Sequence, residues 1–316
     1  MELIKLDLNN IYMPNNLVAC IGVFDGVHCG HSKVINKVIE VAKEKQLKSA
    51  LITFDPHPDF VLNKISKEQY ITPLEDRIKL LNTSFELDYL IIIHFTKQLS
   101  MITYDCFYDL FLKQIKIIVV GEGFRFGNKN YGTVTDLIKL HNNNVISVDH
   151  TYYSNIKEKV SSQDILALLE EGKVSEVLDL GVTYKVSGIV SAGAQIGTKI
   201  GYPTANIDIT DKYCLIKNGV YSVVAIVKNQ RFLGIANYGY NPSFNRVEKP
   251  RLEVHIFDFK EDIYGEKVEV EFLDFIRGEI KFSSIDEFLK QLEIDCRLCI
   301  SKFGGKYETV NCRGNG

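Results

Sequence analysis

A chain of 316 residues with 46% hydrophobic and 24% charged residues is long enough for about two globular domains with ordinary cores. The formal net charge of −3 provides no basic surface for nucleic acid, and no apolar run reaches the roughly 18 residues of a membrane span. The first residues lack the apolar core of a signal peptide, and the seven cysteines are scattered. We therefore expect a cytoplasmic protein with reduced thiols.

The first half of the chain alternates between buried-strand and amphipathic-helix patterns. Strands are predicted at 17–21, 48–54, 89–93, 115–120 and 144–148, and helical stretches at 32–45, 74–81, 106–112 and 134–141. This alternation predicts a parallel sheet with helices on both faces, a Rossmann-like α/β domain over residues 1–158. Ligands of such sheets bind beyond the carboxyl ends of the strands.

The turn at 22–31, Gly-Val-Phe-Asp-Gly-Val-His-Cys-Gly-His, lies between the first strand and the first helix. A helix N-terminus offers free N–H groups and a positive dipole end to a phosphate chain. His28 and His31 can add hydrogen bonds and stabilise charge on an α-phosphate and a leaving pyrophosphate. Histidines that only cap the helix would give the same pattern. The strand–turn–helix context favours a nucleotidyltransferase turn.

After a helical connector at 159–182, which Ser161 or Ser162 is expected to cap, the pattern changes to short strands. They are predicted at 183–190, 219–227, 232–237, 252–257 and 267–275. Regular strand spacing without helices predicts a small closed β-barrel in a second domain, 183–316. A final amphipathic helix at about 284–298 is expected to turn four side chains inward: Ile285, Phe288, Leu289 and Leu292.

A glycine-rich segment of this second half ends in Pro203-Thr204-Ala205-Asn206, and its glycines are Gly188, Gly193, Gly197 and Gly201. Glycine N–H groups can close around phosphates, and Lys199 can add positive charge. Thr204 and Asn206 present oxygens of the kind that Mg²⁺ prefers. The glycines alone also fit a flexible hairpin, whereas the Pro-Thr-Ala-Asn ending favours a phosphate site.

On the strand at 252–257, alternation puts Glu253 and His255 on one side and the aliphatic residues on the other. A carboxylate aimed into a barrel mouth could accept a hydroxyl proton during phosphoryl transfer, although an exposed strand face gives the same alternation. Cys296 and Cys299 form a lone Cys-x-x-Cys with no second pair nearby, so no zinc site is expected.

Together these segments resemble the bacterial bifunctional riboflavin kinase/FAD synthetase family over essentially the whole chain. In the first domain the matching segments are 22–31, 53–58, Gly121 and 124–127. In the second domain they are the glycine-rich segment through Asn206, 219–221, 237–239, 241–244, 252–255 and 277–282. The resemblance implies a nucleotidyltransferase domain that joins AMP from ATP to FMN, and a β-barrel riboflavin kinase domain that makes FMN from riboflavin and ATP.

The resemblance also implies roles for individual residues. Thr204 and Asn206 hold Mg·ATP, and Glu253 is the base that activates the riboflavin 5′-hydroxyl. His28 and His31 act in adenylyl transfer. Contacts to nucleotide or flavin are expected from Gly22, Phe24, Asp25, Gly26, Gly30, Ser161, Ser162, Gly193, Gly197, Lys199, Gly201, Pro203, Asn237 and Arg277.

Two positions depart from the family pattern in the first domain. Gly123 stands where the family has an acidic residue, and Leu166 where it has an arginine after Ser161-Ser162. A phosphate-binding arginine contributes about 1.5–3 kcal/mol per contact, so its loss in the transition state would slow adenylylation up to about a hundredfold.

This leaves several interpretations. The chain is either a bifunctional enzyme or a monofunctional riboflavin kinase whose first domain is inactive or regulatory. A non-enzymatic flavin sensor is disfavoured because binding alone needs no base. Other His-x-Gly-His enzymes, which activate pantetheine phosphate or glycerol phosphate, would lack the barrel. We expect flavins and ATP as partners, neither nucleic acid nor membrane, and leave self-association open.

Overall fold

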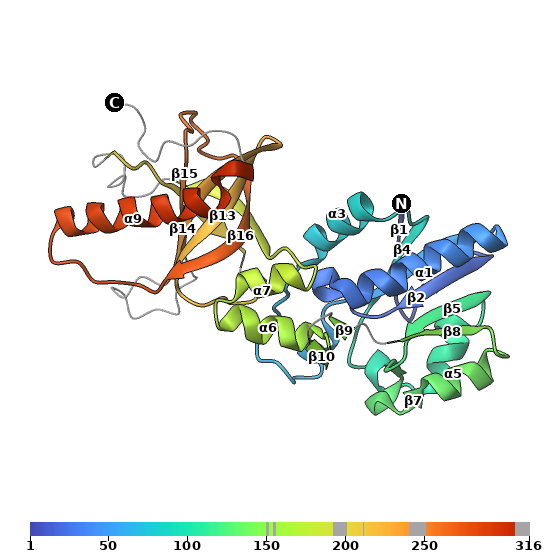
Figure 1. Cartoon of the computed structure of the whole chain (residues 1–316). Coiled ribbons are helices and arrows are strands. Elements are labelled where there is room, and N and C mark those ends of the chain that lie inside the picture. Colours follow the sequence, from blue (N-terminus) through green and yellow to red (C-terminus); the bar gives the residue numbers. More distant parts are fainter. Residues whose placement is uncertain (150–151, 154–155, 192–200, 211, 240–250, 307–316) are drawn as a thin grey trace. The chain divides into compact units, whose positions relative to one another are not determined.

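The computed structural model describes residues 1–149, 152–153, 156–191, 201–210, 212–239 and 251–306. The chain forms two compact units, Met1–Ser162 and Gln163–Gly316. The first contains a twisted sheet between helices and the second a barrel (Figure 1). Among the described residues, no helix has the length and apolar character needed to cross a membrane.

The sheet of the first unit has six parallel strands in the order β1-β4-β3-β2-β5-β8. They are β1 (Glu2–Leu6), β2 (Leu17–Ile21), β3 (Lys48–Asp55), β4 (Tyr89–His94), β5 (Ile117–Gly121) and β8 (Val145–Val148). Every residue of β2 is buried, as expected for a strand covered on both faces. The predicted α/β sheet is confirmed. Of these six strands only β1 was not predicted, because this edge strand is short, contains two charged residues and is largely exposed.

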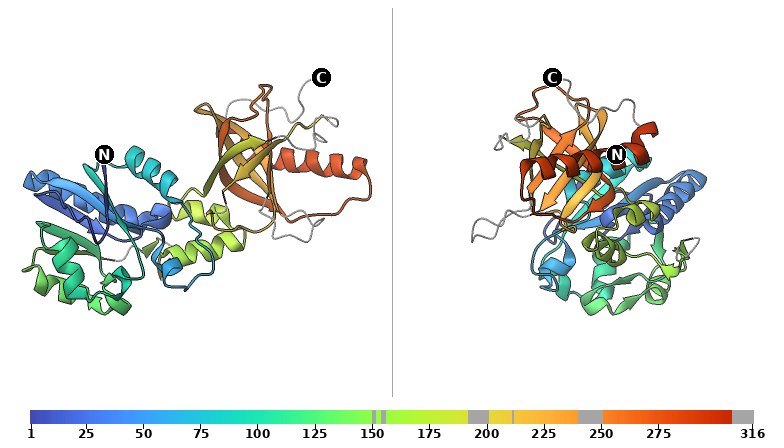
Figure 2. Two further views of the ribbon diagram at one scale, coloured as in Figure 1. Left: turned by 180° about the vertical axis from the view of Figure 1, so that it is seen from behind. Right: turned by 60° about the vertical axis from the view of Figure 1, so that its left-hand side comes forward.

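Helices cover both faces of this sheet (Figures 1 and 2). On one face, α1 (Cys29–Lys45) and α3 (Leu74–Ser84) contribute Val38 and Leu81 to an apolar cluster that includes Val18 of β2. On the other face lie α4 (Tyr104–Phe107), its π-helical continuation Tyr108–Leu112, and α5 (Val134–Leu140). The remaining short elements are a 3₁₀ turn Asp25–Val27, α2 (Pro58–Val61), β6 (Arg125–Phe126), β7 (Gly132–Thr133), β9 (Tyr152–Tyr153) and β10 (Ile156–Lys159).

Two helices come first in the second unit, α6 (Ser162–Glu170) and α7 (Val174–Asp179). Ser162, the first residue of α6, is counted as the last residue of the first unit. A closed antiparallel barrel follows, in the strand order β11-β12-β15-β14-β13-β16. Its strands are β11 (Lys185–Ser191), β12 (Ala205–Ile209), β13 (Gly219–Val227), β14 (Gln230–Gly239), β15 (Arg251–Ile256) and β16 (Lys267–Arg277). The predicted barrel is confirmed. β12 was not predicted as a strand because its first residues belong to the Pro-Thr-Ala-Asn segment.

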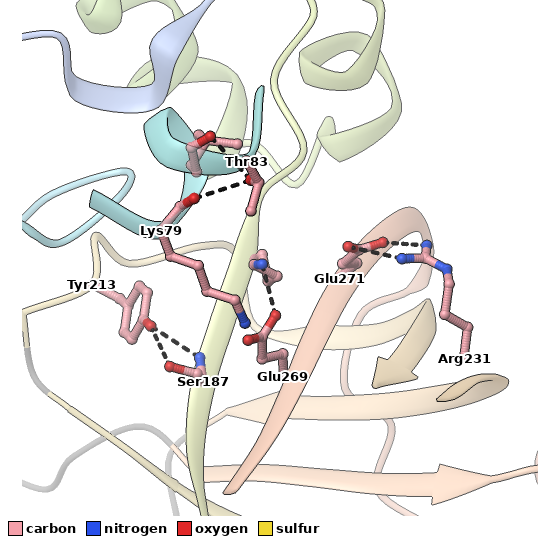
Figure 3. Close-up of polar contacts among 9 residues, drawn as sticks. Lys79, Thr83, Ser187, Tyr213, Arg231, Glu269 and Glu271 are labelled. Carbon is pink, nitrogen blue, oxygen red and sulfur yellow. Dashed lines mark hydrogen bonds and ion pairs between the residues drawn. The ribbon is translucent and has the colours of Figure 1, made fainter. Parts of the chain in front are cut away.

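Aromatic rings fill the barrel and polar pairs connect its strands and loops. The rings of Tyr184, Tyr221 and Tyr238 lie 5.5, 5.1 and 6.4 Å from that of Phe272. In Figure 3 the Tyr213 hydroxyl faces Ser187, and the Arg231 guanidinium donates two hydrogen bonds to Glu271. A barrel packed in this way leaves its outer face and its ends for ligands.

The final helix, α9 (Ile285–Phe303), packs against the outside of the barrel (Figure 1). Cys296 and Cys299 are fully buried in an apolar cluster with Leu233 and Ile235, so this Cys-x-x-Cys is part of the core. In the described residues, no three His, Cys, Asp or Glu side chains gather as a metal site would require. The prediction that Ile285 faces inward is wrong, since 65% of it is exposed. In the apolar cluster between helix and barrel, Leu289 is the first helix residue.

Candidate active sites

Hydrogen bonds to Val23 and Asp25 hold the turn between β2 and α1 in place. The Val23 carbonyl accepts hydrogen bonds from Thr53 Oγ1 at 2.8 Å and from Arg77 Nη1 at 3.0 Å. The Asp25 carboxylate accepts from the backbone N–H groups of Ile71 at 2.9 Å and Thr72 at 2.8 Å. Asp25 is only 4% exposed, and burial raises the pKa of its carboxyl group against the opposing effects of Arg77 and the two N–H groups. Its oxygens are thus engaged within the fold.

The two histidines of the turn have different roles. His28 is the N-cap of α1, and its Nδ1 accepts from the N–H groups of Gly30 at 3.1 Å and His31 at 3.3 Å. The helix therefore begins at Cys29, three residues before the predicted start, and His31 lies in its first turn. The two imidazole rings stack with centres 3.7 Å apart. The helix-capping interpretation describes His28 but not His31.

The surroundings of His31 disfavour its charged form. Burial, then the neighbouring His28 and then Arg77, lower the pKa of His31 well below its ordinary value. Its buried Nδ1 has no hydrogen-bond partner within the described part of the chain. A neutral imidazole with a free ring nitrogen can donate or accept a hydrogen bond at neutral pH without carrying charge.

A cavity of about 260 Å³ opens beside these rings, at the carboxyl ends of β2, β5 and β8. β2 and β5 are neighbours whose connections run to opposite sides, which is the switch point where α/β sheets bind ligands. Of the predicted binding residues, those lining the cavity are Gly22, Phe24, His28, Gly30, His31, Ser161 and Ser162. Gly26 has φ +75° and packs on Ile71, beneath the turn. Gly123 lines the cavity, so this departure from the family pattern lies at the site.

In the second unit, one row of residues crosses five neighbouring strands. Asn206 pairs with Glu253, Glu253 with Asn237, Asn237 with Val220, and Val220 with Arg277. Four strand spacings of about 4.8 Å make this row roughly 19 Å long. Tyr238, next to Asn237, points into the barrel, so the row lies on the outer face. The expectation that Glu253 points into the barrel mouth is therefore wrong.

A cavity of about 690 Å³ covers this row from Glu253 to Arg277 and is bounded by the outer barrel face, the segment 279–282 and α9. Its polar lining residues are Thr204, Asn237, Glu253, His255, Arg277, Glu279, Lys281 and Asp295, and its apolar ones include Val220, Ile235, Phe282, Phe288 and Leu292. His255 lies beside Glu253, as the alternation predicted, and its Nδ1 is 2.8 Å from the Pro203 carbonyl oxygen. The cavity combines an apolar slot with a polar row.

A second cavity of about 530 Å³ lies on the other side of the Pro203–Thr204 segment. Gly201, Pro203, Val254 and Ile256 line it together with residues 259–264. Thr204 borders both cavities and Asn206 follows it on β12. Three predicted binding residues, Gly193, Gly197 and Lys199, lie outside the described residues, as does the matching segment 241–244.

Sequence reasoning missed Asp295, a fully buried carboxylate that lines the larger cavity and pairs with Arg277. An acidic residue in an amphipathic helix normally faces water. A signal was nevertheless present, because Asp295 follows Leu292 by three residues and precedes Cys299 by four, which is the inward face of the helix. Arg77, fully buried beneath the histidine turn, was also missed.

The fold and these sites define a two-unit, nucleotide-dependent transferase. The histidine turn lies at the switch point of an α/β sheet, and the row that contains Glu253 lines one of two cavities of the barrel unit that share Thr204. Models of two families match the chain, FAD synthetase over residues 11–164 and riboflavin kinase over residues 180–303. The chain belongs to the bifunctional riboflavin kinase/FMN adenylyltransferase family.

Known proteins resemble the chain over most of its length. The bifunctional riboflavin kinase/FMN adenylyltransferase of Listeria monocytogenes is 36% identical, over 89% of this chain and 90% of the relative. The Bacillus subtilis protein of the same name is 34% identical, over 90% and 92%. A crystal structure of a Streptococcus pneumoniae protein that carries the name macrolide-efflux protein is 32% identical. It aligns with a TM-score of 0.86 over 94% of this chain and 98% of that one.

Proposed function

We propose that the barrel unit transfers the γ-phosphate of ATP to the 5′-hydroxyl of riboflavin, giving FMN and ADP. The observation that carries this assignment is the position of Glu253, between Asn206 and Asn237 on the wall of the larger cavity and next to the cavity that Thr204 borders. Riboflavin occupies the larger cavity with its flat ring against Val220 and Phe288, and ATP occupies the smaller one. Thr204 lies where the two substrates meet.

In this scheme Glu253 accepts the proton of the 5′-hydroxyl as the new O–P bond forms and the bond to the leaving ADP breaks. Thr204 and Asn206 fit a magnesium ion, because their side chains offer a hydroxyl and an amide oxygen and the nucleotide phosphates supply further ligands. Bound there, the ion would neutralise charge on the phosphates. Asn237 orients the polar chain of riboflavin toward Glu253.

The first unit joins FMN to ATP, giving FAD and pyrophosphate. An FMN phosphate oxygen attacks the α-phosphorus, and the pyrophosphate leaves toward the N-terminus of α1. His31 hydrogen-bonds the phosphates as a neutral group, and His28 holds the helix start in place. Ser161 and Ser162 contribute hydroxyl groups from the far wall of the cavity. The alternative, a riboflavin kinase with a silent first unit, rests on Gly123 and Leu166.

One assay separates these functions. The pure protein is incubated with ATP, Mg²⁺ and either riboflavin or FMN, and the flavins are resolved by chromatography. The bifunctional assignment predicts FMN and FAD from riboflavin, and FAD from added FMN. FMN without FAD in both incubations would favour the monofunctional kinase, and unchanged riboflavin would refute the kinase assignment. The six cysteines in the described residues are all free thiols, which supports a cytoplasmic setting.

A further inference from the structure

Arg277 occupies the end of the cavity row opposite to Asn206 and is held from three sides. Its Nε lies 3.1 and 3.0 Å from the two Asp295 carboxylate oxygens, and its Nη2 lies 2.8 Å from Asp295 Oδ2. Nη1 donates to the Gly278 carbonyl at 3.0 Å. The guanidinium carbon lies 5.8 Å from the centre of the Phe282 ring. These contacts restrain the orientation of the Arg277 guanidinium.

The surroundings of Asp295 hold its carboxylate in place for the contact with Arg277. Its side chain is fully buried on α9, and Gln291, one turn earlier, donates to Oδ1 at 2.9 Å. A buried carboxylate is costly unless it has a charged partner and hydrogen bonds, and Arg277 and Gln291 provide both. A guanidinium matches a carboxylate with a rigid fork of donors, which fixes direction as well as charge.

The pair leaves part of the guanidinium available to a ligand. Arginine has five N–H donors, and three of them are used by Asp295 and Gly278. The remaining two have no partner within the described residues, and Arg277 lines the cavity. Three strand spacings, roughly 14 Å, separate Arg277 from Glu253, so Arg277 meets the ring end of riboflavin and not the transferred phosphate. The ring carries carbonyl oxygens that accept such bonds.

We propose that Asp295 is a positioning residue for flavin recognition: it holds Arg277 so that two guanidinium N–H groups face the isoalloxazine carbonyls. This inference rests on the proposed riboflavin kinase activity. Because the contact lies far from the reacting atoms, it acts on the binding of riboflavin and not on the rate of phosphoryl transfer. It also makes α9, through one carboxylate, part of the substrate site.

The first test is Asp295→Asn in the full-length protein, with FMN formation measured against riboflavin concentration. We expect KM for riboflavin to rise about tenfold while kcat changes less than about twofold. The riboflavin Kd, measured from the quenching of flavin fluorescence, rises by the same factor. Asp295→Glu keeps the charge and should restore part of the affinity. An unchanged KM and Kd in Asp295→Asn would overturn the proposal.

A double-mutant cycle with Arg277→Met separates positioning from a structural effect. If Asp295 acts through Arg277, then Asp295→Asn changes KM less than about twofold when Arg277 is already Met. An equal increase in both backgrounds would contradict the proposal. The double variant also removes both charges together, so it remains informative where Asp295→Asn alone folds poorly.

Arg297→Gln on the same helix is the matched control, because it breaks only an exposed ion pair with Glu293, and it should leave KM unchanged. FAD formation from added FMN serves as a second control in every variant. A wild-type protein that makes no FMN would refute the proposed kinase itself. An active wild type with an unaffected Asp295→Asn variant would refute only the role of Asp295.

Discussion

Replacing Asp25 tests whether this residue anchors the histidine turn or binds the nucleotide. Asp25→Ala leaves the Ile71 and Thr72 N–H groups, now bonded at 2.9 and 2.8 Å, without an acceptor in a buried site. Hydrogen bonds to a charged group contribute about 1.5–3 kcal/mol each, so the loss in the free energy of unfolding is about 3–6 kcal/mol. Asp25→Asn keeps one acceptor oxygen, and about half of that loss is expected.

Urea unfolding, followed by circular dichroism, measures this effect, and the two enzyme activities report on each unit separately. We expect Asp25→Ala to lose FAD synthesis together with the cooperative unfolding of the first unit, while FMN formation by the barrel persists. Asp109→Asn, which removes an exposed carboxylate from the same unit, is the control and should leave the unfolding curve unchanged. Wild-type stability of Asp25→Ala combined with a raised KM for ATP would refute the anchoring role and favour direct nucleotide binding.

Three further predictions concern the same two units. Leu166→Arg puts a guanidinium on α6 one turn after Ser162, on the same helix face. If a missing phosphate contact limits FAD synthesis, its rate should rise several-fold, whereas an unchanged rate in the folded variant would exclude that cause. Burial lowers the pKa of His31, so below about pH 6.5 the unfolded chain binds a proton at this residue that the folded chain does not bind. The free energy of unfolding therefore falls as the pH drops through that value. His31→Asn should reduce this slope by at most about 1.4 kcal/mol per pH unit, measured by urea unfolding at several pH values; an unaltered slope would mean that His31 is protonated in the fold. Thr204→Val should lower kcat/KM for FMN formation about tenfold or more and spare FAD synthesis, whereas Thr204→Ser should retain activity; equal kinetics in Thr204→Val would remove Thr204 from the site.

The main elements of the fold follow from local patterns in the sequence. The strand 17–21 is visible as a continuous apolar run, which a strand covered on both faces requires, and the helix 32–45 is visible because its apolar residues recur at helical spacing. One strand of the six-stranded sheet and one strand of the barrel were missed. β1 lies at the sheet edge and is largely exposed, and β12 has an apolar alternation too short to distinguish from a loop.

Site residues were predictable from the sequence where a motif indicates the chemistry. They were not predictable where contacts between residues far apart in the chain determine the role of a side chain. Residue type and spacing singled out His28, His31, Thr204 and Glu253, and the family resemblance added the other lining residues of the first cavity. Asp25 is an example of the second kind, because its partners Ile71 and Thr72 lie more than forty positions away and turn a candidate ligand into a structural anchor. Asp295 is similar, since only the packing of α9 on the barrel brings it to Arg277.

The account depends most on Glu253 as the base of a riboflavin kinase. The decisive measurement compares FMN formation from riboflavin and ATP in the wild type and in Glu253→Gln, with FAD formation from added FMN as the internal control. We predict that FMN formation falls at least about a hundredfold in the variant, while riboflavin binding and FAD formation are unchanged. FMN formation near the wild-type rate in Glu253→Gln would contradict the assignment of the base and of the row of residues around it.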